Sequence, residues 1–441
     1  MKSSIEPNTR FSFALYLVYL VSFFLHIPAR IPFLGLIRFD LLLVASIVLS
    51  ILSSNVGRRT ELATSSKYLL LLIAYAVFSL PLVEWPGSVI GGGFEAFVKG
   101  IIFYFFTVFL VKDVNRLKIL LIIFVACNLI RIIEPLVLNL TTGYLGSRTH
   151  LGYGEFAGRL SGAPSDVINP NGLAFVIASV FPFLHYVYAP TNKKTFLIYL
   201  ILVPMLIYTM SLTLSRSGVV ALAIIAFGIW LKSKRKVLVI FLCSLGLVLT
   251  FFSLNDIQKD RYLSIVSSDA KQSASAEGRI EGWFSDFRVA MNRPIFGHGL
   301  GSSREANWNV AGKDQISHIL WAEVWQEVGL IGLIIFILYL KSMISNFLKA
   351  GKLVKANLDS GDFLYRCVQA MQVWLLMNLL FSLASYGLKS YEWYLFGGLS
   401  VVILNLVMVR IYNSQSADHR DLSVHESVGR FSLAQRINRI K

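Results

Sequence analysis

Apolar runs of about 17 to 25 residues recur along the whole chain, and a helix needs this length to cross the hydrocarbon of a bilayer. Only 15% of the 441 residues are charged, whereas about a quarter are charged in a soluble globular protein. The sequence therefore predicts an all-α, polytopic integral membrane protein with about 12 transmembrane helices. The expected spans are residues 11–27, 34–53, 67–83, 97–111, 117–138, 171–189, 194–212, 215–231, 236–254, 318–340, 366–387 and 393–411.

The basic residues alternate along the chain as the positive-inside rule describes. With the N-terminus in the cytoplasm, clusters such as "KSKRK" (232–236) fall in inner loops, and the outer loops are poorer in Lys and Arg. This topology accounts for the formal net charge of +16, so we do not expect nucleic acid as a partner. Both chain ends are then expected inside, with residues 139–170 and 255–317 in the periplasm. No small-residue cleavage site follows the first span, which we expect to be retained.

Three parts of the chain can be distinguished. Residues 1–138 are expected to form N-terminal transmembrane helices, 139–411 a transmembrane core that includes the periplasmic loop 255–317, and 412–441 a basic cytoplasmic tail. Long loops in compact proteins usually have a function. The segment 139–170 is rich in Gly, Ser, Thr and Tyr, which suits either hydrogen bonding to sugars or a mobile linker.

The loop 255–317 contains an amphipathic stretch. Its apolar residues Ile280, Trp283, Phe284, Phe287 and Ala290 follow helical spacing. We expect a short helix lying on the outer membrane surface, with its aromatic side chains at the level of the lipid headgroups. Further along this loop, "GHGLG" does not follow a strand and lacks the glycine spacing of a nucleotide-binding loop, so it predicts a tight turn.

Arg216 opens an apolar run that the basic cluster at 232–236 closes, so it lies at the outer end, where the positive-inside rule gives it no role. Arg279 and His318 are expected on the same side. Taken singly, Arg216 could be an interfacial anchor, Arg279 an ordinary loop charge and His318 an interfacial histidine. Taken together, two arginines and a histidine form a candidate site for an anionic headgroup, because the guanidinium fork matches phosphate oxygens and histidine can act as a base.

Two acidic residues lie inside the tenth span. Glu323 and Glu327 are four residues apart, so they share one helix face, which we expect to point into the bundle. They either support the site or form hydrogen bonds to neighbouring helices or loop backbone. In the fifth span, Arg131 and Glu134 are three residues apart and are expected to form an internal ion pair.

The sequence does not suggest metal or redox chemistry. The outer loops contain no DxD pair and no cluster of His and Asp ligands, so we expect no metal ion and no cofactor. The cysteines Cys127, Cys243 and Cys367 fall inside apolar runs, so they do not indicate a disulfide framework.

Four motifs in order carry a resemblance to a known family. They are "GRLSGAPSDVINPNGLAF", "SLTLSRSGVVAL", "GRIEGW…NRPIFGHGLGSS" and "SHILWAEVWQEVGLIGLIIF". Between about Gly158 and Phe336 the chain resembles the bacterial O-antigen ligase/polymerase superfamily. The first motif contains Arg159, which we take as a supporting residue together with Glu323 and Glu327.

The resemblance implies an inverting, metal-independent glycosyltransferase of the bacterial inner membrane. Such enzymes use undecaprenyl diphosphate, which is anchored among the membrane lipids, as the carrier of a glycan. They move the glycan to a glycan or lipid A-core acceptor at the periplasmic face. Arg216 and Arg279 then correspond to diphosphate-binding arginines and His318 to the essential histidine, as a base or as a donor to a phosphate oxygen. Ile319 follows His318, where the family often has a polar residue.

Two questions stay open at the level of sequence. The resemblance covers ligases that join finished O-antigen to lipid A-core, polymerases of O-antigen or exopolysaccharide repeat units, and protein glycosyltransferases. A transporter or flippase of the same lipid-linked oligosaccharide is the alternative from another class. It would favour polar groups near the membrane midplane and paired broken helices in two halves, whereas this chain has one deep acidic pair and no convincing internal repeat.

Overall fold

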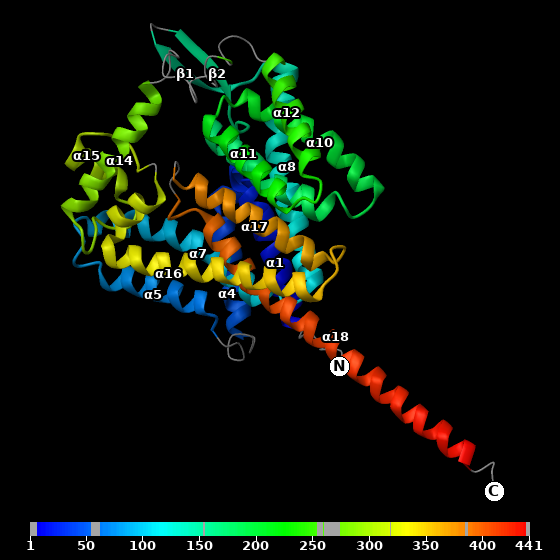
Figure 1. Ribbon diagram of the computed structural model, residues 1–441. Helices are drawn as coiled ribbons and strands as arrows, with labels where there is room; N and C mark the ends of the chain where they lie inside the picture. The colour runs from blue at the N-terminus through cyan, green and yellow to red at the C-terminus, as the bar shows by residue number, and fades with distance from the viewer. Residues whose placement is uncertain are drawn as a thin grey trace.

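The computed structural model describes residues 7–53, 62–152, 155–253, 259, 274–317, 319–383 and 387–437. These residues form a helical bundle with one small sheet (Figure 1). The N-terminal helices are α1 (Pro7–Phe24), α2 (Ile27–Arg30), α3 (Pro32–Leu36), α4 (Phe39–Ser53), α5 (Thr64–Phe78), α6 (Pro86–Ser88), the π-helix η2 (Val89–Gly93), α7 (Phe94–Leu110) and α8 (Val114–Thr142). Strands β1 (Gly146–Gly152) and β2 (Glu155–Leu160) follow. The remaining helices are α9 (Pro170–Phe183), the π-helix η3 (Leu184–Tyr188), α10 (Lys193–Leu212), α11 (Arg216–Lys232), α12 (Lys236–Ser253), α14 (Ala274–Asn292), α15 (Ser303–Ala311), α16 (Leu320–Asn357), α17 (Phe363–Phe381) and α18 (Tyr391–Ile437).

A helix overlaps each of the twelve predicted spans. Within the described part of the chain, six helical segments are long and apolar enough to cross a membrane: 86–110, α8, 170–188, α10, α16 and residues 391–415 of α18. Shorter apolar helices occur at 9–24, 39–53, 64–78 and 236–246. The chain is therefore a helical membrane protein, and the number of helices that cross the bilayer stays a prediction.

The first helices and the last ones pack against each other. Helix α7 lies beside α18, α5 lies beside α16, and α1 contacts both α4 and α8 (Figure 1). Helix α17 contacts α11 on one side and α16 on the other, so it joins the group formed by α10, α11 and α12 to the group formed by α5, α7 and α16. The segments before and after residue 138 thus contribute to one bundle.

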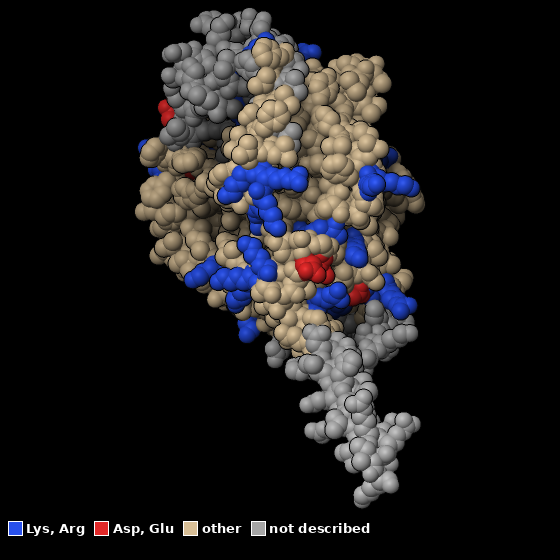
Figure 2. Space-filling view, turned by 45° about the vertical axis from the view of Figure 1, so that its right-hand side comes forward, with Lys and Arg blue, Asp and Glu red and all other residues tan. Residues whose placement is uncertain are grey.

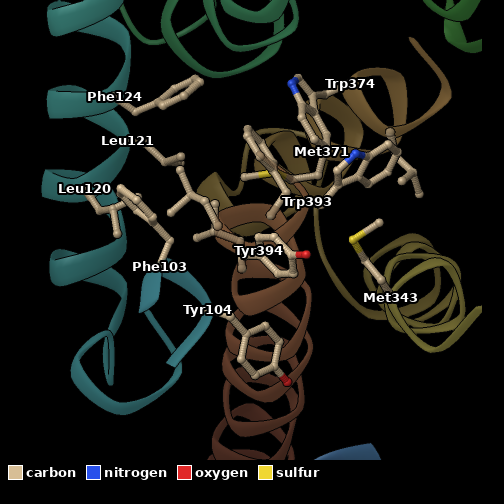
Figure 3. Close-up of a cluster of buried hydrophobic side chains, with 14 of the residues drawn as sticks. Phe103, Tyr104, Leu120, Leu121, Phe124, Met343, Met371, Trp374, Trp393 and Tyr394 are labelled. Carbon is tan, nitrogen blue, oxygen red and sulfur yellow. The ribbon is translucent and has the colours of Figure 1, made fainter. Parts of the chain in front are cut away.

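Large side chains fill the space around the first turns of α18. Figure 3 shows that they come from α7, α8, α16, α17 and α18 itself. Trp374 stacks on Phe396 with their ring centroids 3.4 Å apart. Trp374, Tyr104 and Tyr394 are fully buried, and burial of aromatic side chains of this size makes a large favourable contribution to packing.

The predicted all-α membrane fold agrees with the structure, to which the segment 139–170 adds one two-stranded hairpin. Strands β1 and β2 form an antiparallel hairpin in which Gly146 pairs with Leu160 and Arg148 with Gly158. Tyr144 closes its base, because the tyrosine hydroxyl donates to the carbonyl oxygen of Gly162 over 2.8 Å. The Gly- and Ser-rich composition resembled a loop, but cross-strand pairing satisfies the backbone here.

Within 255–317 the amphipathic stretch forms α14, as its spacing predicted, and α15 follows. Helix α14 packs on α16, and Ala290 on its inner face is fully buried. The predicted turn at "GHGLG" is confirmed, since Gly297, Gly299 and Gly301 all have positive φ. The amide of Gly299 donates to the carbonyl oxygen of Glu327 over 2.9 Å, so the turn docks on α16.

Candidate functional site

Helices α9 and α11 begin side by side. Asn169 caps α9 through a 2.8 Å hydrogen bond from the amide of Gly172 to its Oδ1 atom, and Ser215 caps α11 through a 3.2 Å bond from the amide of Gly218 to its Oγ atom. The two helices approach closely, since a Cβ at Gly218 would lie 2.6 Å from the Cβ of Ala174. Two helix N-termini, which attract negative charge, therefore meet at one level of the bundle.

Arg159 connects these two helix starts to the hairpin. It is buried, its Nε donates to the carbonyl oxygen of Thr213 over 2.8 Å, and its Nη2 donates to Oδ1 of Asn171 over 2.8 Å. The same Oδ1 accepts a 2.9 Å hydrogen bond from the hydroxyl of Ser215. Arg159 thus links the hairpin to the starts of α9 and α11 at the predicted site. Arg216 is the first residue of α11 and follows its capping residue Ser215.

A cavity of about 570 Å³ opens at this level of the bundle. Asn171 and Gly172 of α9 line it, as does Ser217, the residue after Arg216. Its other polar side chains are those of His26, Lys99, Arg131, Asn169, Asn378, Ser382, Lys389, Ser390 and Glu392, and its aromatic ones are those of Phe23, Phe175, Phe381, Tyr391 and Trp393. The cavity therefore combines charged groups of both signs, hydrogen-bonding groups and aromatic side chains.

Glu323 and Glu327 are fully buried and point into the bundle, as predicted. Nζ of Lys389 lies 3.0 Å from an oxygen of Glu327 and 3.6 Å from one of Glu323. Glu323 also accepts hydrogen bonds from the amides of Gly387 and Leu388, and Glu327 accepts one from the amide of Gly301. The pair therefore holds the loop before α18 and the glycine turn in place. Burial opposes the charge of Lys389, but the carboxylates of Glu327 and Glu323 outweigh it and raise the pKa of Lys389.

The expected ion pair between Arg131 and Glu134 is wrong. Arg131 donates instead to both oxygens of Asp166, over 2.6 and 3.0 Å, and both partners are buried. Glu134 lies one turn further along α8 and pairs with Arg30, whose Nη1 is 2.9 Å from its Oε1. Helical spacing alone could not show this, because the actual partners, Asp166 for Arg131 and Arg30 for Glu134, come from distant parts of the chain.

The structure describes one of the three residues that the resemblance singles out fully, one only by its backbone, and one not at all. Arg216 is described and half-buried. Arg279 belongs to α14, but its side chain is outside the described residues, as is the whole of His318. The residue two positions after His318, Leu320, donates its amide over 3.1 Å to the carbonyl oxygen of Ser382, which lines the cavity.

Several cavity residues carry no signal in the sequence as functional groups. Lys389 lies in a short loop between two apolar spans, and Asp166, which pairs with the cavity residue Arg131, lies within "SDVINP". His26 lines the cavity with its Nδ1 atom 3.4 Å from Asp166. A charged or polar residue within a short loop between apolar spans was the only available indication.

Residues 199–337 match the family model described as O-Antigen ligase. A search of the curated proteins found no match to the chain. The matched segment runs from α10 into the first half of α16, so it includes Arg216, Arg279 and His318, whereas residues 158–198 of the resemblance lie outside it. The motif-based resemblance is confirmed over this part of the chain: residues 199–337 of this membrane protein are similar to the O-antigen ligase family.

Proposed function

We propose that the protein is an inverting, metal-independent glycosyltransferase of the bacterial inner membrane. It moves a glycan from undecaprenyl diphosphate to an acceptor hydroxyl at the periplasmic face. The observation that carries this proposal is the O-antigen ligase match at 199–337, whose helix α11 begins at the cavity with Arg216.

The charge around the cavity supports an anionic donor. The capped N-termini of α9 and α11 both face this level, and half-buried Arg216 begins α11 beside the cavity; Lys99 and Lys389 also line the cavity, where they pair with Glu95 and Glu327. In this proposal Arg216 and Arg279 bind the diphosphate, because a guanidinium can contact two phosphate oxygens at once and keeps its charge. Helix N-terminal amides next to Arg216 add further donors to the leaving diphosphate.

The aromatic and amide side chains suit the glycan. Phe175, Phe381 and Trp393 offer flat apolar faces, and Asn378 and Asn169 offer hydrogen bonds beside them. Small-molecule sites commonly combine apolar and aromatic walls with a few fixed polar groups. We place the sugar next to the diphosphate along these walls.

The reaction is a direct displacement at the anomeric carbon. The acceptor oxygen attacks this carbon, the bond to the phosphate oxygen breaks, and the diphosphate leaves with the electron pair. His318 takes the proton of the acceptor hydroxyl as general base. Arg216 and Arg279 stabilise the negative charge that grows on the diphosphate as it departs.

Purified protein mixed with lipid-linked glycan and an acceptor tests the activity. Product formed without ATP and without an ion gradient is the expected result. A protein that transfers the labelled lipid across a vesicle membrane but forms no glycosidic bond would instead be a flippase, and the proposal would be wrong.

Deletion of the gene identifies the acceptor class. Loss of high-mass polymer with single repeats retained indicates polymerisation of O-antigen or exopolysaccharide repeat units. Intact polymer left on its lipid carrier indicates ligation to lipid A-core. Loss of glycan from a protein, with normal polysaccharide, indicates protein glycosylation.

A further inference from the structure

A second cavity lies at the opposite end of α9, α11 and α17 from the first one. Its volume is about 470 Å³, and it lies between η3, the start of α10, the end of α11 and the start of α17. On α11, Ser217 lines the first cavity and Lys232 the second, which corresponds to about 22 Å along the helix axis. The two cavities are therefore separated by most of the thickness of a bilayer's hydrocarbon.

The second cavity is basic. Lys232, Lys234 and Arg366 line it, and none of the described residues that line it is Asp or Glu. Lys232 donates to Oε1 of Gln369 over 2.7 Å and to Oε1 of Gln372 over 2.5 Å, and Arg366 donates to Oγ1 of Thr191 over 3.3 Å. These acceptors are neutral, so they leave the positive charges uncompensated. One face of the bundle also carries many Lys and Arg side chains and few Asp or Glu (Figure 2).

Several hydrogen-bond donors around this cavity are buried and have no acceptor among the described residues. They are Nε2 of Gln369, Nε of Arg366 and the hydroxyl of Tyr186, and Gln369 is only 6% exposed. An unpaired buried donor destabilises a fold, so such groups are normally paired. Gln369 and Arg366 are three residues apart on α17 and share one face, and Lys232 contacts Gln369 from α11. A single ligand with several anionic oxygens could accept from all of them.

The surroundings indicate where such a ligand comes from. Phe196 and Tyr199 of α10 line the cavity, and α10 is the least buried of the six membrane-crossing candidates in the described part of the chain. Phe196, Leu197 and Leu200 are each about half exposed, at 49%, 59% and 50%, so they offer an apolar surface beside the basic groups. An acyl chain can lie along this surface while a phosphate enters the cavity.

We propose that this second cavity binds the phosphate headgroup of an anionic membrane lipid, with Lys232, Arg366 and Gln369 as its donors. Basic pockets between membrane helices are suited to such headgroups because positive charge and unpaired donors meet the lipid phosphate at the edge of the hydrocarbon. The site is independent of the glycosyl transfer proposed above.

A titration of the full chain in dodecyl maltoside tests the site. Dioctanoyl phosphatidylglycerol should raise the unfolding midpoint, followed by tryptophan fluorescence, to a saturating value, because a ligand that binds only the folded state stabilises it. Dioctanoyl phosphatidylcholine should give no shift, and inorganic phosphate should bind at least about tenfold more weakly. Lys232→Gln, Arg366→Gln and Gln369→Leu should each weaken apparent binding of phosphatidylglycerol by about tenfold or more.

Lys352→Gln is the matched control, because it removes one exposed charge of α16 that does not line the cavity. This variant should bind phosphatidylglycerol as the unmodified chain does. If every variant responds like the unmodified chain, the lipid acts through general charge attraction and the site is refuted. If inorganic phosphate binds as tightly as phosphatidylglycerol, the ligand is a free phosphate and the lipid assignment is overturned. Each variant is compared with its own midpoint without lipid, so a lower starting stability does not affect the result.

Discussion

At the scale of single residues, a substitution of Arg216 by lysine tests whether the geometry of the guanidinium matters beyond its positive charge. Arg216→Lys should lose most of the glycosyl transfer activity although the charge remains, because a lysine ammonium cannot contact two phosphate oxygens in the way a guanidinium does. Product formation by purified variants measures this. Arg304→Lys is the control, since Arg304 is exposed and pairs with Asp314 away from the cavity. Full activity of Arg216→Lys would reduce Arg216 to an interfacial anchor.

His318 is proposed to act in chemistry rather than in donor binding. His318→Ala should lower turnover by about 10²–10⁴-fold, the usual contribution of a general base. Donor binding should persist, because Arg216 and Arg279 still hold the diphosphate. Activity of the unmodified chain should fall at acidic pH, since a protonated imidazole cannot accept a proton. If His318→Ala abolishes donor binding instead, His318 is a phosphate ligand and the base has to be sought elsewhere.

Lys389 is the cation that two buried carboxylates share, so its loss should destabilise the fold. Lys389→Met leaves Glu323 and Glu327 without their cation, and breaking a buried pair in this way costs about 3–5 kcal/mol. The unfolding midpoint in detergent should fall clearly. Lys99→Met is the matched control: Lys99 also lines the cavity, but its side chain is 63% exposed and its partner Glu95 is exposed too. That change should alter stability by less than about 1 kcal/mol.

At the scale of elements, the glycine turn depends on one close backbone contact. A Cβ at Gly93 in η2 would overlap the carbonyl oxygen of Leu300, whereas a Cβ at Gly91 of the same helix would meet no atom. Gly93→Ala should therefore destabilise the protein by about 1–3 kcal/mol, as overpacked cores do, and lower activity by displacing Gly301 from Glu327. Gly91→Ala should leave the unfolding midpoint in detergent unchanged or raise it. Equal midpoints for the two variants would contradict the contact.

The elements were predictable where local physics decides them. A helix that crosses a bilayer must be apolar over its whole length and satisfies its own backbone, so the apolar helices could be located from the sequence, whereas the number that cross the membrane stays a prediction. The hairpin β1–β2 could not, because its Gly- and Ser-rich strands become regular only by pairing. The partners of charged side chains could not be predicted from the sequence either: Arg131 pairs with Asp166, 35 residues away, and Arg30 with Glu134, 104 residues away.

The candidate site was predictable only in part, for the same reason. Ser215, directly before an apolar run, indicates the helix start at Arg216. The cavity beside it, however, is lined by residues of α1, α7, α8, α9, α11, α17 and α18 and of the loops before α9 and α18, which meet only in the folded bundle. Lys389 illustrates this, since its neighbours in the sequence give no sign of the carboxylates that it contacts in α16.

At the scale of the whole molecule, the predicted topology places the cavity of Arg216 at the periplasmic face and the second cavity at the cytoplasmic face. Ser273→Cys, in the loop 255–317, should then react with a membrane-impermeant maleimide in intact spheroplasts. Ser360→Cys, between α16 and α17 and exposed beside the second cavity, should react only after lysis. The unmodified chain, with its three native cysteines, sets the background. Labelling of Ser360→Cys in intact cells together with protection of Ser273→Cys would invert the topology, and it would place the proposed glycosyl transfer on the wrong side of the membrane.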